Sequence, residues 1–461
     1  MKPNEIQELT ELALKHVWVP RRTWKELSAP GGFIIFTKGE GRRATDINGN
    51  TYLDYFGAVN GCGGVGWGRR EIADAAYEQM LKLNYAPNHE LSIPKIKLAK
   101  KLADLAPTGK LSKVFFASGG AESVETAMAI SRKYHIISGY RNKHKIIGGY
   151  TYHGSTVATK ATGWRRPSFH WEDFEPLMPG VIHIPSPYCA VCDLGLEYPS
   201  CRIACARYVE RVIREEGPET VTAFLDVPIA STCYVPPPEY WPMIRSICDK
   251  YDVLLILDEI VTGFGRTGKM FASEHWGIKP DITVVGKAFA SGYIPLSAAI
   301  VAREVAEKFE GGPEKMLHHS YTYEGHATAC AAALATIEII EKENLTEHAR
   351  IMGEYMFEGL KTLYKHRIVG DIRSGLGLMC QVELMKNRDN KERFSTQENS
   401  NIAHLLREGL MAYGLFGLFT NPIWVCPMMT ITRVEIDEMI SAFDRAIGDV
   451  ERRVGVDTLI Q

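Results

Sequence analysis

The sequence predicts an α/β protein that has a large domain with a mainly parallel sheet and a small α+β domain built from both chain termini. Three observations lead to this prediction. Short apolar runs alternate with helical patterns from residue 113 to residue 302. These runs lack the polar–apolar alternation of a half-solvated strand, so they indicate strands buried on both faces, as in parallel sheets. The flanks of this region instead mix hairpin signals with long helical patterns.

The predicted strands of the large domain alternate with helices along the chain. Strands are expected at residues 113–117, 145–149, 181–184, 222–227, 252–257, 281–285 and 297–302. Helical patterns at 121–135 and 204–216 fall between them. A strand, a helix and a second strand in this order form the repeating unit of a parallel sheet.

Both chain ends contribute to the predicted small domain. The turn INGN at 47–50 separates two strand patterns, which indicates a hairpin. After residue 326 come helical patterns at 326–343, 345–365, 398–412 and 434–453 and a strand candidate at 376–384. We therefore expect the small domain to combine residues 1–64 and 326–461, and the large domain to span residues 65–325.

Composition argues against several classes of protein. The 461 residues include 53 Lys and Arg against 55 Asp and Glu, which gives a net charge of −2. This balance, without basic blocks, argues against a protein that binds nucleic acid or anionic membranes. No apolar run approaches the roughly 18–20 residues that span a bilayer. The N-terminal sequence MKPNEIQELTELALKH has no signal-peptide core, so the sequence predicts a cytoplasmic protein.

The ten cysteines are too few for a disulfide scaffold. Most stand alone in apolar runs and are predicted to be small buried side chains. One cluster differs, because Cys189, Cys192, Cys201 and Cys205 have the spacing C-x2-C-x8-C-x3-C, which would suit a structural zinc ion. No histidine stands at ligand spacing, so we predict that the cluster packs within a loop and that the chain has no metal site.

The first candidate site lies in FFASGGAESVETAM at 115–128. A predicted strand ends at Ala117, Gly119 and Gly120 form a turn, and a helix starts near Ala121. Glycines let the backbone approach a ligand closely, and the N–H groups of a new helix bind anions such as phosphate. The glutamates near the helix start also suit the helix dipole, which is a purely structural role. By itself this motif is a weak indication of a phosphate site, because many strand–turn–helix units share it.

Two further candidates follow predicted strands that one crossover joins. Asp258 ends the strand in LLILDEIVTGFGRTG, and Lys287 follows the strand in DITVVGKAFASG, 29 residues later. Ligands bind at the carboxyl ends of strands in open α/β sheets. A carboxylate there could hold a metal, orient a base or bind a protonated ring nitrogen, and a partly desolvated lysine becomes a nucleophilic amine. The alternatives are a capping aspartate and a solvated lysine, so the pairing carries more weight than either residue.

An anion cradle, a carboxylate and an amine at one sheet edge are the groups that pyridoxal 5′-phosphate (PLP) requires. The cradle holds the phosphate, the acid pairs with the ring nitrogen, and the lysine forms the imine. The sequence therefore predicts PLP as the cofactor, with Asp258 at its protonated ring.

Seven segments spread over the chain carry a family likeness. They are DINGNTYLDY, FFASGGAESVETAMAISR, YTYHGST, VPPPEYWPMIRSICDKYDVLLILDEIVTGFGRTG, PDITVVGKAFASGYIPLSA, TYEGHATACAAALA and TITRVEID. From about Gly31 to about Gly448 the sequence resembles the class III, or ω-, aminotransferases, a PLP-dependent family of fold type I. Within that family it resembles most the transaminases that use amines or taurine with pyruvate. The resemblance implies the fold type I architecture for the predicted domains.

The resemblance also implies roles at the cofactor. Lys287 corresponds to the lysine that forms the Schiff base and shuttles the proton, and Asp258 corresponds to the partner of the pyridinium nitrogen. Tyr152 and Ile260 correspond to the residues that sandwich the ring.

The remaining matched residues concern the phosphate and the assembly. Gly119, Gly120 and Ala121 correspond to the phosphate cup. Thr322 corresponds to a residue that reaches the phosphate of the neighbouring subunit, which implies an obligate homodimer and leaves a tetramer open. Supporting roles fall to His153, Glu259 and Arg266.

Three departures from the family pattern bear on the substrate. The arginine that binds a substrate carboxylate in members acting on amino acids falls near Gly417, and its glutamate partner falls at Val227. The aromatic residue that walls the pocket of amine transaminases falls near Gly61, so Gly61, Gly63 and Gly64 predict an open wall. These departures favour an amine or ω-amino donor, with pyruvate as the acceptor.

The acceptor carboxylate would then need an arginine from elsewhere. Arg166 and Arg43 are candidates, although both also suit surface positions, and Glu324 stands without explanation where the family favours a small residue. Two rival predictions keep the cofactor: a lyase or racemase of the same family, and an amino-acid transaminase whose arginine lies elsewhere. A third is a cofactor-binding protein without turnover.

Overall fold

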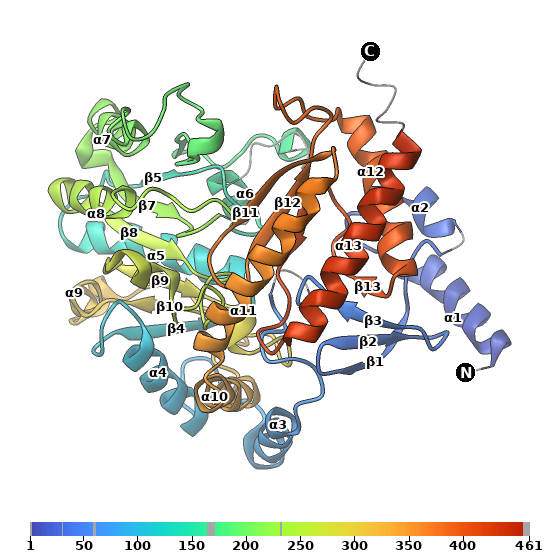
Figure 1. Cartoon of the computed structure of the whole chain (residues 1–461). Helices are drawn as coiled ribbons and strands as arrows, with labels where there is room; N and C mark the ends of the chain where they lie inside the picture. The colour runs from blue at the N-terminus through green and yellow to red at the C-terminus, as the bar shows by residue number, and fades with distance from the viewer. Residues whose placement is uncertain (1, 30, 59–60, 164–170, 231–232, 455–461) are drawn as a thin grey trace.

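Seven strands form a central sheet in the computed structural model, which describes residues 2–29, 31–58, 61–163, 171–230 and 233–454 (Figure 1). Across the sheet the order is β4 (Lys113–Ala117), β10 (Ser297–Val301), β9 (Ile282–Val285), β8 (Leu254–Asp258), β7 (Val221–Asp226), β5 (Lys145–Gly148) and β6 (Val181–His183). Strands β9, β8, β7, β5 and β6 are parallel, whereas β10 runs antiparallel to both β4 and β9. The prediction of a mainly parallel sheet is confirmed, with one reversed strand.

Side chains of the central strands alternate between two helical layers. Phe224 and Leu255 share an apolar core with α7 (Ala204–Glu216) and α8 (Tyr240–Tyr251). Ala223 and Ile256 belong to a second core with α5 (Gly120–Ile137). Every residue of β7, β8, β9 and β10 is buried. Because both faces are covered, these strands are apolar at nearly every position.

A third group of helices packs beside the β4 edge of the sheet. Helix α10 (Ala327–Lys342) lies against α3 (Arg70–Leu83) and α4 (Ile93–Leu105), and α4 also contacts β4 (Figure 1). The remaining short helices are α1 (Pro3–His16), α2 (Trp24–Ser28), α6 (Val157–Thr162) and α9 (Arg303–Ala306).

Two smaller sheets complete the fold, and the first combines strands from both ends of the chain. One has the order β1 (Phe36–Glu40), β2 (Arg43–Asp46), β3 (Thr51–Asp54) and β13 (Leu415–Phe416), and the other has β11 (Val369–Ser374), β12 (Cys380–Leu384) and β14 (Ile423–Val425). The β2–β3 hairpin confirms the predicted turn at 47–50. Because β13 pairs in parallel with β3, the two chain ends share one sheet. Helices α11 (Leu345–Leu360), α12 (Thr396–Ala412) and α13 (Arg433–Val454) lie with these sheets (Figure 1).

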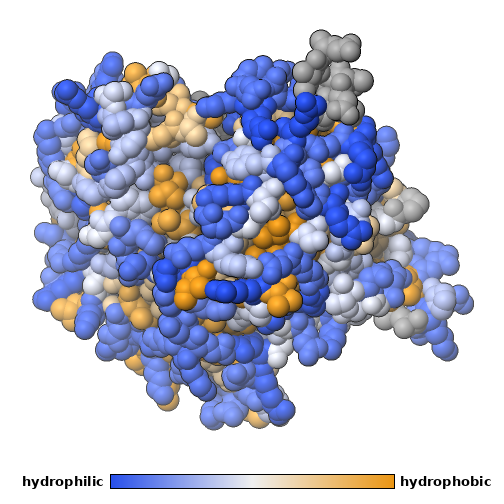
Figure 2. Space-filling model, viewed as in Figure 1, coloured by the Kyte–Doolittle hydropathy of each residue, from blue (hydrophilic) through white to orange (hydrophobic). Residues whose placement is uncertain are grey.

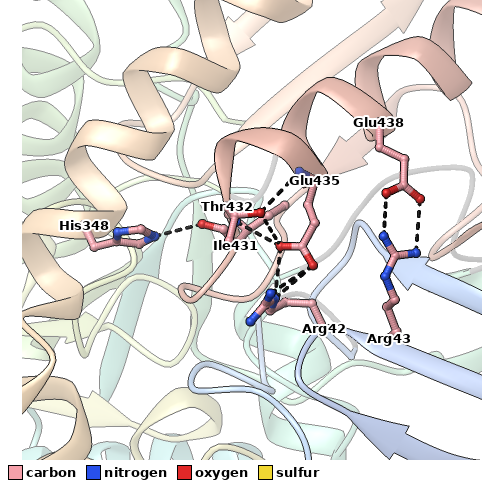
Figure 3. A network of polar contacts seen from close by, with 7 residues as sticks. All are labelled: Arg42, Arg43, His348, Ile431, Thr432, Glu435 and Glu438. Atoms are coloured by element: carbon pink, nitrogen blue, oxygen red, sulfur yellow. Dashed lines mark hydrogen bonds and ion pairs between the residues drawn. The ribbon is translucent and has the colours of Figure 1, made fainter.

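Ion pairs fasten the N-terminal sheet to the start of α13 (Figure 3). Arg42 donates through Nε and Nη2 to the carboxylate of Glu435, at 3.0–3.1 Å. Arg43 makes a second bidentate pair with Glu438. Glu435 also accepts the N–H of Thr432 at 3.0 Å, while Thr432 caps the helix in return. Charge-assisted bonds of this kind fix the direction in which α13 leaves the sheet.

The outer surface is mostly polar on the face seen in Figure 2, where hydrophobic side chains form scattered patches. Among the helices of the described residues, none combines the length and apolar character needed to cross a membrane. The predicted burial of isolated cysteines is confirmed at Cys248, Cys330 and Cys380.

Candidate active site

Three strand ends deliver polar side chains to one edge of the central sheet. Parallel strands β7 and β8 end at Asp226 and Asp258, and Lys287 follows β9 by two residues. Strand β4 ends at the same edge, because two antiparallel steps through β10 restore its direction. The turn at Gly119 therefore meets these residues, as the sequence predicts. This edge is where open α/β sheets bind their ligands.

Close glycine contacts show that these segments touch one another. A Cβ added to Gly120 would lie 2.7 Å from Cδ1 of Ile260, and one added to Gly286 would lie 3.4 Å from Cγ2 of Ile260. A Cβ on Gly154 would lie 2.5 Å from Cβ of Ala121. The structure thus brings the glycine turn, the 258–260 segment and the 152–154 segment into one site.

Lys287 has the properties of a reactive amine. It follows Gly286 at the start of a 3-10 turn with φ +48°, a left-handed conformation that is costly for a residue with a Cβ. Burial lowers the pKa of its ammonium group, and nearby Asp258 only partly offsets this. No described residue forms a hydrogen bond with its Nζ. A larger fraction of this amine is therefore neutral than in a solvated lysine.

Asp258 is held rigidly beside the lysine. Its side chain is only 4% exposed, and Oδ1 accepts the N–H of Ile260 at 3.0 Å. Oδ2 lies 2.8 Å from Nδ1 of His153, which is itself buried. The backbone N–H and the imidazole thus contact one oxygen each of this buried carboxyl group.

The glycine turn is ready to bind an anion. Gly119 precedes α5, and Oε2 of Glu122 accepts the N–H groups of Ser118 and Gly119 at 2.8 and 3.1 Å. Among the described residues, no acceptor binds the N–H groups of Gly120 and Ala121, which begin the helix. Free N–H groups at a helix start attract phosphate through both hydrogen bonds and the helix dipole.

Tyr152 lies at the open side of the site. It is 37% exposed, and its hydroxyl is 3.2 Å from Oγ of Ser155. The guanidinium of Arg21 lies over the ring of Tyr152, 5.8 Å from its centre. Sequence reasoning missed Arg21, because only the fold brings this N-terminal residue to the site.

The comparisons with known proteins decide the family. A family model described as aminotransferase class III matches residues 28–447. The chain belongs to the class III aminotransferases. It is 34% identical to a taurine–pyruvate aminotransferase of Bilophila wadsworthia, over 97% of this chain and 99% of that protein. It is 36% identical to a diaminobutyrate–2-oxoglutarate transaminase of Halomonas elongata, over 94% of each.

Solved structures confirm the fold of this class III aminotransferase. An (S)-enantioselective ω-transaminase from Thermomicrobium roseum superposes with a TM-score of 0.90, at 36% identity over 96% of this chain and 98% of that one. The prediction of fold type I is therefore confirmed.

Class III aminotransferases use PLP, so the predicted cofactor is confirmed. The residues present fit this cofactor. Lys287 offers an amine and Asp258 a buried carboxylate, and Gly120 and Ala121 offer N–H groups that no acceptor in the described part of the chain binds. These are the groups that bind the aldehyde, the ring nitrogen and the phosphate of PLP.

Thr322 does not join the other predicted residues in this chain. It is exposed on the loop before α10, and its carbonyl accepts the hydroxyl of Tyr85 at 2.9 Å. The same loop explains Glu324, which pairs with Lys95 at 3.6 Å while both side chains stay largely buried. The unexpected glutamate therefore anchors the Thr322 loop to α4.

Tyr55 accounts for the glycine at the family's arginine position. A Cβ on Gly417 would lie 2.5 Å from Cζ of Tyr55. The Tyr55 ring is fully buried, and its hydroxyl donates to the carbonyl of Leu418 at 2.7 Å. Position 417 therefore has no room for a side chain.

The predicted open wall at the N-terminal glycines is wrong. A Cβ on Gly61 would lie 2.8 Å from the guanidinium of Arg266, and one on Gly63 would lie 3.0 Å from Met428. Arg266 donates to the carbonyl of Gly61 at 3.2 Å, so it fills the space beside this glycine. Arg43 makes a bidentate pair with Glu438, and its role at the acceptor carboxylate stays a prediction. Arg166 lies outside the described residues.

The four clustered cysteines line one small hollow together, as a packed loop would require. Burial raises the pKa of the Cys205 thiol to about 11, so this thiol stays protonated near neutral pH. Within the ranges that the structure describes, no three His, Cys, Asp or Glu side chains are placed to hold a metal ion. The lack of a metal site stays a prediction.

Proposed function

We propose that this class III aminotransferase moves an amino group from an amine or ω-amino compound to pyruvate. The observation that carries the proposal is the contact between Tyr55 and Gly417. It leaves no place for the arginine that would bind the carboxylate of an amino-acid donor or of 2-oxoglutarate. The taurine–pyruvate relative supports the same choice of acceptor.

When bound, PLP supplies an aldehyde carbon that combines with amino groups and a ring that withdraws electrons from it. In our proposal Nζ of Lys287 holds the cofactor and later carries the proton that leaves the donor carbon. Asp258 accepts a hydrogen bond from the ring nitrogen. Gly120 and Ala121 bind the phosphate through their N–H groups, and Gly119, which has no side chain, lets the phosphate approach the turn. Tyr152 and Ile260 enclose the ring and exclude water.

Arg21 is our candidate for the acceptor carboxylate. It lies over the ring of Tyr152, the residue that we assign to one face of the cofactor ring. Its planar guanidinium would bind the pyruvate carboxylate through two parallel hydrogen bonds.

We propose further that the active site is shared between two copies of the chain. Thr322 is exposed, and Tyr323 beside it is 63% exposed. Leu91 and Ile93, at the start of nearby α4, are 69% and 71% exposed. A second copy would cover this apolar surface and receive Thr322 at its phosphate site. Formation of a tetramer stays open.

Complementation tests the shared site. The variants Lys287→Ala and Thr322→Glu are each expected to lose activity, the second because its carboxylate repels the phosphate. Co-expression should restore activity, since one site of the mixed dimer has a normal Lys287 and a normal Thr322 from its partner. Absence of any recovery, with mixed dimers present, would contradict sharing.

Acceptor kinetics test the proposed reaction. The holoenzyme is supplied with one of several amines and with either pyruvate or 2-oxoglutarate, and kcat/KM is measured for each acceptor. The kcat/KM for pyruvate should exceed that for 2-oxoglutarate by about tenfold or more. This ratio corresponds to the free energy of about one good charge-assisted interaction. A preference for 2-oxoglutarate would favour the amino-acid transaminase instead. Product formation without amino transfer would favour a lyase.

A further inference from the structure

A second buried carboxylate lies behind Asp258, and the proposed reaction does not use it. Asp226 is the last residue of β7, and it pairs in register with Leu257 of the neighbouring strand β8. Its side chain is only 3% exposed. Burying a carboxylate at this depth costs folding free energy unless nearby polar groups compensate for the lost water. A buried acid with such partners is a candidate for a functional role.

Three hydrogen-bonding contacts connect Asp226 to Asp258 in a single line. Oγ1 of Thr151 donates to Oδ1 of Asp226 at 3.1 Å and lies 2.9 Å from Nε2 of His153. Nδ1 of His153 lies 2.8 Å from Oδ2 of Asp258. All four side chains are buried. They come from three adjacent strands, since Thr151 and His153 follow β5, which pairs with β7 on the side away from β8.

Backbone groups of neighbouring residues surround the Asp226 carboxylate closely. A Cβ on Gly149 would lie 2.6 Å from Oδ2 of Asp226, so only a glycine leaves room for this oxygen. The N–H of Val227 donates to Oδ1 at 2.8 Å. The carboxylate is therefore fixed from two sides in addition to its bond with Thr151.

The charge on His153 depends on which groups along this line donate and which accept. Thr151 has one hydroxyl proton, which it donates to the Asp226 carboxylate, so its oxygen accepts from Nε2 of His153. The Asp258 carboxylate also accepts, so Nδ1 carries a proton as well. An imidazolium between two carboxylates satisfies every contact. A neutral ring satisfies them only if Asp226 or Asp258 holds the proton instead.

The Asp226 carboxylate carries its charge near neutral pH. Burial raises the pKa of Asp226 to about 6, and His153 opposes this rise, so Asp226 is a carboxylate above that pH. The titratable groups that face Asp226 are His153, Asp258 and the hydroxyl of Tyr240 on α8. Burial raises the pKa of Tyr240 well above its usual value, so it adds no charge.

We propose that Asp226 is a positioning residue that acts through Thr151 to keep His153 doubly protonated beside Asp258. The proposal rests on the assigned role of Asp258 at the ring nitrogen. A cation at Oδ2 stabilises Asp258 as a carboxylate in a dry site and fixes its orientation toward the cofactor. Asp226 balances that cation, so the line carries a single net negative charge.

The test follows the protonation of His153 directly. Holoenzyme labelled with [15N]histidine is titrated by NMR from about pH 6 to about pH 10, and the His153 signals are assigned by their loss in His153→Asn. At about pH 8 exposed histidines are neutral, which isolates the imidazolium signal. The parent should show both ring nitrogens of His153 protonated at this pH. A neutral His153 in the parent would overturn the proposal.

Matched variants distinguish the proposed effect of Asp226 through Thr151 from an effect of packing alone. Thr151→Val keeps the shape and removes the hydroxyl, whereas Thr151→Ser keeps it. Asp226→Asn removes the charge and keeps an oxygen for Val227. Thr151→Val and Asp226→Asn should each lower the pH at which His153 loses its proton by about one unit, the size expected for a lost charge partner. Thr151→Ser should behave as the parent.

A distant carboxylate provides the control. Asp281→Asn alters a half-buried acid that pairs with Arg245 near the opposite end of β9, and it should leave the His153 titration unchanged. Unchanged titration in both Thr151→Val and Asp226→Asn would overturn the proposal. The His153 titration does not depend on the amino donor or the acceptor. Failure of the proposed amine–pyruvate reaction would therefore appear separately, in the acceptor kinetics.

Discussion

Substitution at Gly417 tests whether Tyr55 determines the choice of acceptor. In Gly417→Arg the new Cβ would overlap the Tyr55 ring at 2.5 Å, and the buried ring has no free space to enter. Overpacking of this kind costs about 1–3 kcal/mol. Displacing Tyr55 would also break its 2.7 Å hydrogen bond to Leu418, worth about 1 kcal/mol. We expect the free energy of unfolding to fall by about 2–4 kcal/mol, without any gain of activity with 2-oxoglutarate.

The double variant Tyr55→Ala/Gly417→Arg should behave differently. Removing the ring creates room for the guanidinium, which would then bind the second carboxylate of 2-oxoglutarate. A charge-assisted interaction worth about 1.5–3 kcal/mol corresponds to a rise of about 10–150-fold in kcat/KM for this acceptor. Urea unfolding and acceptor kinetics measure the two effects. A stable Gly417→Arg single variant that uses 2-oxoglutarate well would show that Tyr55 does not exclude an arginine at position 417.

Four further outcomes are expected. Lys287→Ala should reduce amino transfer by about a thousandfold or more, because no other amine replaces its proton transfer, and single-turnover kinetics measure this loss. Arg21→Leu should raise KM for pyruvate about tenfold while Arg21→Lys raises it less, since lysine keeps the charge but loses the planar fork. Burial opposes the ionisation of Glu435, but hydrogen bonds from Arg42 outweigh it and lower the pKa below the usual 4.5. The parent should therefore lose stability relative to Glu435→Gln as pH falls below about 4.5, which urea unfolding at several pH values would show. Cys205→Ser should leave the metal content of the purified protein at zero equivalents, and a stoichiometric loss of zinc would contradict the packing interpretation.

The sequence was sufficient for the buried strands but not for their directions. Strand β10 is apolar throughout, as an inner strand must be, whether it runs parallel or antiparallel. Burial on both faces determines its composition, while its direction depends on connections that the local pattern does not show. Strand β11 escaped prediction because it contains Asp371 and Arg373, whose charges are satisfied by each other and by Glu383 on β12.

The candidate site was predictable where chemistry follows directly from a strand end. Asp258 and Lys287 stand at such positions, and Asp226 gave the same signal in TAFLD, where a charged residue closes an apolar run. The open wall predicted from Gly61 is wrong, because Arg266, 205 residues away in the sequence, fills the volume beside this glycine. Arg21 gave no local signal at all. Contacts of this kind depend on tertiary packing, which motif spacing does not encode.

The most direct test of the account is the transfer of nitrogen itself. The holoenzyme would be incubated with a 15N-labelled amine and unlabelled pyruvate, and the alanine formed would be examined by mass spectrometry. Alanine should acquire the 15N label in step with loss of the amine, and Lys287→Ala should form almost none. Loss of the amine with no label in alanine, or label that moves only to glutamate when 2-oxoglutarate is supplied, would contradict the central claim.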